Sequence, residues 1–472
     1  MKLSKIGYAL RRLTCALIVL VLVSTSASFT TGVRAIEYTD NTKIRIGLEF
    51  GAKAPSEAVF TCSQGFMVVS YDETSHTHTP VFQTAETTIT VKNVGGKAII
   101  LSKSGTPLYS GSDVVYIRGN NNSLKYKSKI YIEVIKLQCK DGLLRVINFL
   151  SLENYIKGVL PREIFPSWPE EALKTAAIVA RTFAISSLSG KHKNYGCDVC
   201  TTTCCQVFGG NGDNEDPRTN AAIDATKNIV VAYGNKTALT VYTSSTGGHT
   251  ESSSGAWGSS QEGYPYLAGV AVPFETPEEY PNGKWTKTIA ASELKSYLNS
   301  KYGGKLTGDI LSIDTEHGET GYCRKITVTD TNGNAISAKA SGGVRDFLAR
   351  YVHSAKFTIK PNYYEAGSTL SVLSGDGTVQ KRANLPSGSI TVMRAGSDTP
   401  VPLYRFSAPC SFTIDGYGYG HGVGLSQYGS MTLAKSGKTY EEIIATYFPG
   451  TYLTTLGALG MVNALEAESS AD

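Results

Sequence analysis

One carboxylate, Glu163, stands near the middle of the chain between two segments with helical periodicity. Its neighbours Ile164 and Phe165 are apolar. Apolar surroundings disfavour the ionised form of a carboxyl group and raise its pKa, which suits a general acid. The alternative from the local pattern is a connector carboxylate that pairs with Arg162 or Arg181.

Four cysteines fall within the nine residues from Cys197 to Cys205, the other two being Cys200 and Cys204. Thiolates at these spacings can meet around one tetrahedral zinc ion, and a local disulfide is the competing interpretation. Adjacent residues cannot easily bind one metal ion with good geometry. We therefore expect Cys205 to be a ligand and leave Cys204 open.

Two loops further along the chain are rich in glycine and polar residues. Residues 243–251 carry several hydroxyl groups, and such loops supply hydrogen-bond donors for sugar hydroxyls. Residues 416–429 alternate glycine with Tyr417, Tyr419, His421 and Val423, so the backbone there can approach another group closely or adopt positive φ. His421 could also be a hydrogen-bonded histidine in a tight turn.

The elements that must position these groups follow from the spacing of apolar residues. A period of 3.6 residues begins after Ser151 and predicts a helix that ends at Pro161. A second helix is predicted from Ser167, the first residue of a capping box, to Gly190. Glu163 would then lie in the short connector between the two helices.

We predict an α+β fold in which a helical catalytic block packs with several antiparallel β-rich subdomains. Strand signals come early, at residues 43–48, 66–70, 88–91, 97–101 and 130–134. The predicted divisions are a signal peptide or membrane anchor (1–35), a β-rich domain (36–145), a core with the cysteine cluster (146–281), an α/β segment (282–360), inserted β hairpins (361–411), the Gly/His loop with the C-terminal helices (412–455) and a disordered tail (456–472).

The N-terminus has a basic segment, an apolar run at residues 13–23 and small residues after it. This order predicts a secretory signal, and an uncleaved membrane anchor is the alternative. Either one places the rest of the chain outside the cytoplasm, with membrane contact only through this segment. Four basic residues precede the apolar run, so the formal charge without them is 5 − 4 = +1. Such a charge excludes an electrostatic footprint for nucleic acid.

In four blocks the sequence resembles the SpoIID/LytB family of bacterial cell-wall proteins. The blocks are residues 152–182, 197–207, 244–251 and 418–429. The resemblance implies that Glu163 is the catalytic carboxylate and that the cysteine cluster holds a zinc ion, most safely through Cys200 and Cys205. Because thiolate-rich sites are usually closed, we expect this zinc ion to be structural. Family members often have histidine where this chain has Cys204, so Cys197 or His192 is expected to complete the ligand set.

The resemblance also implies an activity. Sporulation members of the family are lytic transglycosylases that cut peptidoglycan strands already stripped of stem peptides by a partner amidase. Such an enzyme would form 1,6-anhydro ends, with Glu163 as acid and then base. Substrate contacts are expected from the two loops, at Ser244, Ser245, His249, Glu251, Tyr419, His421 and Gln427.

Expected partners are peptidoglycan glycan strands, a cell-wall amidase and other sporulation membrane proteins. Two other functions remain open from the sequence. One is a non-catalytic protein that binds wall glycan and enhances an amidase. The other is a zinc hydrolase with Cys200, Cys205 and a histidine around a metal-bound water.

Overall fold

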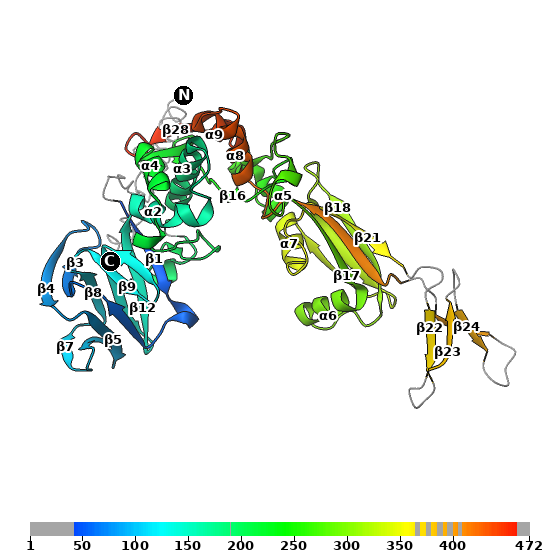
Figure 1. Cartoon of the computed structure of the whole chain (residues 1–472), viewed down its shortest axis with the longest axis horizontal. Helices are drawn as coiled ribbons and strands as arrows, with labels where there is room; N and C mark the ends of the chain where they lie inside the picture. Colours follow the sequence, from blue (N-terminus) through cyan, green and yellow to red (C-terminus); the bar gives the residue numbers. More distant parts are fainter. Residues whose placement is uncertain are drawn as a thin grey trace, which may run out of the picture.

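The computed structural model describes residues 42–188, 190–363, 369–373, 379–384, 390–393, 400–404 and 408–459 (Figure 1). Helices and several sheets are both present, which confirms the α+β class. The predicted leader and most of the predicted tail lie outside the described residues. In the part that is described, no helix is long and apolar enough to cross a membrane.

The N-terminal domain is built from two sheets that share one hydrophobic core. Along β2 (Glu57–Thr61), buried and exposed residues alternate, as expected for a strand with one face on the core. The seven-stranded sheet has the order β13 (Val199–Cys200), β1 (Lys43–Glu49), β12 (Leu143–Ser151), β11 (Val134–Lys140), β8 (Val114–Gly119), β3 (Phe66–Tyr71) and β4 (His78–Thr84). The six-stranded sheet has the order β10 (Lys129–Ile132), β9 (Ser123–Tyr126), β2 (Glu57–Thr61), β5 (Thr88–Val94), β6 (Lys97–Ser102) and β7 (Pro107–Ser110).

Two features of this domain differ from the sequence prediction or extend it. The strand predicted at residues 130–134 is divided between β10 and β11, because Glu133 has a φ of 65° that interrupts the extended backbone. The edge strand β13 comes from the cysteine segment and pairs in parallel with β1, with Cys200 opposite Gly47. The cysteine segment is thereby attached to the N-terminal sheet.

A helical block lies next to this domain (Figure 1). Its central helix, α3, contacts the four other helices of the block. Buried alanines on α3, such as Ala177 and Ala180, allow this close packing. The helices are α2 (Leu152–Glu163), α3 (Glu170–Ser186), α4 (Pro217–Ala225), α8 (Gln427–Lys435) and α9 (Tyr440–Tyr447).

The ends of α2 and α3 differ from those predicted. Pro161 lies inside α2, since its fixed φ is compatible with a helix and the last turn is held by Ile164 N–H on Leu160 O (3.1 Å). Glu163 is therefore the last residue of a helix and not a connector residue. At α3 the N-cap is Pro169, which has no side-chain donor or acceptor, so the predicted capping box does not form.

An α/β module follows the helical block and has its own hydrophobic core. One sheet has the order β17 (Lys284–Ala290), β26 (Ser411–Tyr417) and β21 (Phe357–Asn362), and the other has β18 (Ile310–His317), β19 (Cys323–Asp330) and β20 (Ala335–Lys339). The helices are α5 (Ser253–Trp257), α6 (Ala291–Tyr302) and α7 (Ser341–Phe347). Because β21 and β26 are neighbours, the chain leaves this sheet and returns to it around the two hairpins β22–β23 (Thr369–Leu373, Val379–Asn384) and β24–β25 (Ile390–Met393, Pro400–Tyr404), which project from its far end (Figure 1).

Short strands connect the helical block to the module. The sheet β15 (Lys236–Thr237), β14 (Ile229–Tyr233) and β28 (Tyr452–Thr455) packs on the helices. The pair β16 (Tyr242–Thr243) and β27 (Leu425–Ser426) is parallel. The strand that pairs antiparallel with β14 after its turn is β15, and Tyr242 pairs with the distant Leu425.

Candidate active site

The carboxyl group of Glu163 is half-buried at the C-terminal end of α2. Its Oε1 accepts a hydrogen bond from the backbone N–H of Val207 at 2.8 Å. Burial raises the pKa of Glu163, and hydrogen bonds from Val207 and the Tyr242 side chain oppose that rise. The direction of the shift is the one that the sequence predicts, and it favours a protonated carboxyl group.

The alternative interpretation of Glu163 as an ion-paired residue does not describe this structure. Arg181 is fully buried and makes two hydrogen bonds to Glu153, at 2.8 and 2.7 Å. It also donates to the carbonyl groups of Ile223 and Ile229. Among the described residues no basic side chain forms an ion pair with Glu163, so the carboxyl group faces neutral surroundings.

Glu163 lines a groove with a volume of about 390 Å³. Four of the seven predicted substrate contacts line the same groove, namely Ser244, Tyr419, His421 and Gln427. Gln427 also donates from Nε2 to the backbone oxygen of Glu163 at 3.0 Å. The groove therefore brings together the end of α2 and both of the polar, glycine-rich loops.

The pair β16–β27 explains why these loops meet. Tyr242 lies opposite Leu425, and Thr243 lies opposite Ser426. The next contact is a two-way backbone pairing of Ser245 and Tyr419, at 3.2 and 3.1 Å. Four of the five alternating glycines have positive φ, which L side chains rarely adopt: Gly418, Gly420, Gly422 and Gly424. The fifth, Gly416, lies in strand β26.

Three predicted substrate contacts do not line the groove: Ser245, His249 and Glu251. Glu251 is fully buried, and its Oε1 accepts hydrogen bonds from Arg324 (2.7 Å) and Thr320 (3.0 Å). These hydrogen bonds tie the buried carboxylate to two residues that do not line the groove. The substrate role predicted for Glu251 therefore has no support from the geometry. The Nδ1 of His249 hydrogen-bonds to the backbone oxygen of Thr250 at 2.7 Å, and Ser245 is buried.

His421 combines the two interpretations that the sequence left open. It lines the groove, and its Nδ1 accepts a hydrogen bond from Val423 N–H at 3.0 Å within a tight turn. Burial, with a smaller contribution from the nearby Arg345, lowers the pKa of His421 to about 4. The imidazole is therefore neutral at pH 7. Its ring also contacts Trp257, with centroids 5.4 Å apart.

The cysteine segment forms one cluster of metal-binding groups. The ligand atoms of His192, Cys200, Cys204 and Cys205 lie within 4.8 Å of one another. Three sulfur atoms and one imidazole nitrogen match the usual ligand set of a tetrahedral zinc site. Both adjacent cysteines reach the cluster, because a turn closed by Cys205 N–H on Thr202 O (3.0 Å) directs them to the same side. A hydrogen bond from Cys205 lowers the pKa of the Cys200 thiol.

Cys197, predicted as a further ligand, lies outside this cluster. Its side chain is fully buried between Gly47 and Phe50, where a Cβ atom added at Gly47 would be 2.6 Å from its sulfur. The pairing of β13 with β1 fixes the backbone after Cys197, so its side chain enters the core of the N-terminal domain. His192, the other residue that the sequence offered, joins the cluster in its place.

The residues after Cys205 connect the cluster to Glu163. Gln206 is fully buried, donates to Tyr242 Oη (3.3 Å) and accepts from Tyr155 Oη (3.2 Å). Val207 gives the hydrogen bond to Glu163. A Cβ atom at Gly158 would lie 2.2 Å from the Phe208 ring, so glycine is required for this segment to pack on α2. The cluster thus holds the residues that orient the carboxyl group.

Sequence reasoning missed three residues of the site. Tyr242 hydrogen-bonds to Glu163, and nothing in the sequence around Tyr242 indicates this partner. Arg345 lines the groove from α7, and the sequence gave no sign of this position. Glu275 is buried and accepts from the backbone N–H groups of Thr246 and Gly247, which supports the first loop.

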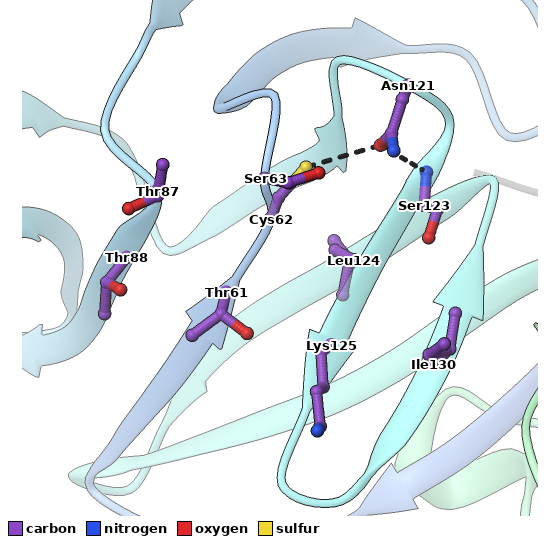
Figure 2. Close-up of a pocket in the computed structure, with 10 residues that line it drawn as sticks. All are labelled: Thr61, Cys62, Ser63, Thr87, Thr88, Asn121, Ser123, Leu124, Lys125 and Ile130. Carbon is purple, nitrogen blue, oxygen red and sulfur yellow. Dashed lines mark hydrogen bonds between the residues drawn. The ribbon is translucent and has the colours of Figure 1, made fainter.

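A second hollow, of about 420 Å³, lies in the N-terminal domain (Figure 2). It is lined mainly by hydroxyl and amide side chains, and Lys125 is the one charged group among its ten lining residues. Asn121 Oδ1 accepts from the Cys62 thiol (3.3 Å) and from Ser123 N–H (3.3 Å), as Figure 2 shows. No lining residue is a carboxylic acid or a histidine, so this hollow has no acid of the kind that Glu163 provides in the groove.

Comparisons with known proteins point to the same part of the chain. The family model for the stage II sporulation protein SpoIID matches residues 140–233, a range that includes Glu163 and the cysteine cluster. The chain is 26% identical over 464 residues to the amidase enhancer of Bacillus subtilis (strain 168), covering 87% of this chain and 59% of that protein. It is 27% identical over 323 residues to the stage II sporulation protein D of the same organism, covering 66% of this chain and 76% of that protein. The chain therefore spans about three fifths of the length of the amidase enhancer.

Proposed function

The chain belongs to the stage II sporulation protein D family, and on that premise we propose that it is a peptidoglycan lytic transglycosylase. Its substrate would be the bond from N-acetylmuramic acid to N-acetylglucosamine in glycan strands without stem peptides. The observation that carries the proposal is the position of Glu163, a carboxyl group with a raised pKa that lines a groove between two polar loops.

The proposed reaction uses Glu163 twice. The neutral carboxyl group gives its proton to the glycosidic oxygen, and the bond from muramyl C1 to that oxygen breaks as the sugar leaves with a 4-hydroxyl group. The muramyl 6-hydroxyl oxygen then bonds to C1 while its proton passes to the carboxylate of Glu163. No water is consumed and the acid is restored, so no second carboxylate is needed to activate water. This agrees with a groove in which Glu163 is the one carboxylate among the lining residues.

Other lining residues would hold the glycan in register. Ser244 and Gln427 carry groups that can hydrogen-bond to sugar hydroxyl and acetamido groups. Tyr419, which lines the groove, is 41% exposed, and such a ring can stack on a sugar ring. Trp257 does not line the groove but contacts His421, which does, and its ring is 45% exposed. Neutral His421 would shape the groove, since its pKa is too low for it to carry a positive charge at pH 7.

The ligand set of His192, Cys200, Cys204 and Cys205 fits zinc, which we propose as a structural cofactor. A zinc ion with four protein ligands has no open position for water or substrate and acts as a cross-link. This argues against the zinc hydrolase that the sequence left open. In our proposal the cluster residues fix the segment from which Gln206 and Val207 orient Tyr242 and Glu163.

A second function has one observation in its favour. One relative, whose match covers 87% of this chain, is named for enhancing an amidase. The same groove could bind glycan and stimulate a cell-wall amidase without cutting the strand. Under either function we propose an extracytoplasmic protein, secreted or anchored through its N-terminal segment, that acts in the wall remodelling of sporulation and engulfment with an amidase and sporulation membrane proteins as partners.

Purified protein on denuded glycan strands tests the main proposal. Mass spectrometry is expected to find 1,6-anhydro ends with the native chain and with the control Glu57→Gln, which makes the same change on the surface of the N-terminal domain. Glu163→Gln is expected to give none. If Glu163→Gln still produces anhydro ends, Glu163 is not the acid. If the native chain produces none but accelerates an amidase, the second function is the correct one.

A further inference from the structure

Arg345 places a positive charge in the groove that the proposed reaction does not use. It is the one lysine or arginine among the groove's lining residues, and it is half-buried on α7. Its Nε donates to the backbone oxygen of His353 at 3.1 Å. No carboxylate in the described part of the chain forms an ion pair with it. A partly desolvated guanidinium without a carboxylate partner is suited to bind an anionic ligand.

The surrounding backbone fixes where this guanidinium lies. A Cβ atom at Gly342 would be 2.7 Å from the backbone oxygen of Ala256, so glycine allows α7 to pack directly against α5. The hydrogen bond to His353 then restrains the side chain of Arg345 from the other side. These two contacts hold the guanidinium at the groove wall near His421. The arrangement is preorganised, so less side-chain entropy is lost when a ligand binds.

The chemistry of the proposed substrate indicates which anion this is. The sugar rings and acetamido groups of the glycan are neutral. The acidic group of the strand is the lactyl carboxylate on N-acetylmuramic acid, which is free after the stem peptide has been removed. While the peptide is attached, the same carbon atom belongs to a neutral amide. A guanidinium forms two parallel hydrogen bonds with a carboxylate but cannot do so with an amide.

We propose that Arg345 binds the free lactyl carboxylate of N-acetylmuramic acid and thereby selects strands that have lost their stem peptides. This inference rests on the proposed glycan-binding function of the groove. Arg345 is assigned to binding and not to proton transfer, because a guanidinium stays protonated in proteins. Positive charge develops at C1 of the sugar during cleavage, and a guanidinium beside that atom would destabilise it.

The expected selectivity for the free carboxylate follows from the guanidinium of Arg345, which loses its charged partner when the ligand carries an amide. With an amide in place of the carboxylate, the guanidinium is covered by ligand but has lost its charged partner. Sites built around a buried polar group reject ligands that leave that group unpaired. The loss of a charge-assisted hydrogen bond corresponds to about a tenfold to hundredfold weaker affinity.

The test measures binding separately from cleavage. In a Glu163→Gln background, the dissociation constant of the full chain is measured for denuded strands and for the same strands with the lactyl carboxylates converted to primary amides. The expected result is binding to the free carboxylate that is about ten times tighter or more. Arg345→Gln should abolish this ratio, while Arg345→Lys should keep part of it. The control is Arg350→Gln, which removes the same charge from an exposed residue that does not line the groove and should keep the full ratio.

Three results would overturn the inference. The first is equal affinity of the Glu163→Gln chain, with Arg345 intact, for the two kinds of strand. The others are an affinity ratio that Arg345→Gln does not diminish and no measurable binding of denuded strands. None of them decides whether Glu163 cuts the strand, since the binding background is already inactive in the proposed mechanism. Conversely, a native chain that binds selectively but yields no anhydro ends would remove the enzymatic proposal and leave the role of Arg345 in place.

Discussion

The two hollows of the molecule have nearly the same volume, about 420 Å³ in the N-terminal domain and about 390 Å³ beside Glu163. The first is lined by neighbouring strands of one sheet, mainly with hydroxyl groups on its exposed face. The second is lined by segments from α2 to the glycine-rich loop, which are distant in the sequence. The two hollows therefore do not differ in size. They differ in that the packing of distant segments holds a carboxylic acid in apolar surroundings beside the groove and not in the N-terminal hollow.

The sharpest way to break this comparison is to remove one ionisable side chain from each hollow, Glu163 from the groove and Lys125 from the N-terminal hollow. Glu163→Gln is expected to lower glycan cleavage by at least about 10²–10⁴-fold, because the residue would serve as both acid and base. Lys125→Gln in the N-terminal hollow is expected to leave the rate within about twofold, since surface substitutions have small effects. Rates of anhydro-end formation check both. A comparable loss in Lys125→Gln would mean that the N-terminal hollow contributes to the reaction.

The cysteine cluster gives the next largest effect. Cys205→Ser is expected to lose the bound zinc, because structural zinc contributes on the order of 10 kcal/mol in zinc-finger peptides and needs all of its ligands. Cys197→Ala should keep a full equivalent, since Cys197 lies outside the cluster. Metal content by mass spectrometry and melting temperature check the pair. Loss of zinc in Cys197→Ala but not in Cys205→Ser would reverse the assigned ligand set.

Much of the site could be predicted from residue types alone. Glu163, the cysteines and the glycine-histidine loop are local signals, because an isolated carboxylate, clustered thiols and alternating glycines each have few physical uses. Element boundaries were less predictable where tertiary packing overrides local preference. Pro161 was expected to end its helix, but its φ is compatible with a helix, and the helix continues to Glu163.

The residues that the sequence could not provide depend on long-range contacts. The role of Tyr242 could not be read from the sequence because its strand partner, Leu425, lies on a distant segment. Glu251 looked like a ligand for sugar because Arg324, which neutralises it, is 73 residues away. Only the folded structure shows that Arg345 lines the groove. No periodicity or spacing rule carries this information, since it arises when separate segments pack together.

The helical block and the N-terminal domain also differ in how deeply their ion pairs are buried. Arg181 is fully buried and pairs with Glu153, whereas Lys92 and Glu57 are 42% and 49% exposed. Glu153→Gln leaves the buried guanidinium without its counter-charge and is expected to cost about 3–5 kcal/mol of unfolding free energy. Glu57→Gln should cost about 0–1 kcal/mol. Urea denaturation followed by circular dichroism measures both, and equal midpoints would show that the buried pair is not a determinant of stability.

The smallest expected effect concerns the pH dependence of cleavage, which the groove can show and the N-terminal hollow cannot. The reaction begins with protonated Glu163, so the rate should fall as pH rises through its pKa, which burial raises above the usual 4.5. Tyr242→Phe removes a hydrogen bond that favours the carboxylate, so it should raise this pKa and move the falling limb to higher pH. A shift of one pH unit corresponds to about 1.4 kcal/mol, and we expect less than that.

The raised pKa of Glu163 also affects stability, because the folded state binds this proton more tightly than the unfolded state. The free energy of unfolding should therefore decline as pH rises through this pKa. Glu163→Gln should be more stable than the native chain at pH 7. A limb that moves to lower pH in Tyr242→Phe, or a Glu163→Gln chain that melts below the native one at pH 7, would contradict the account of how burial sets this acid.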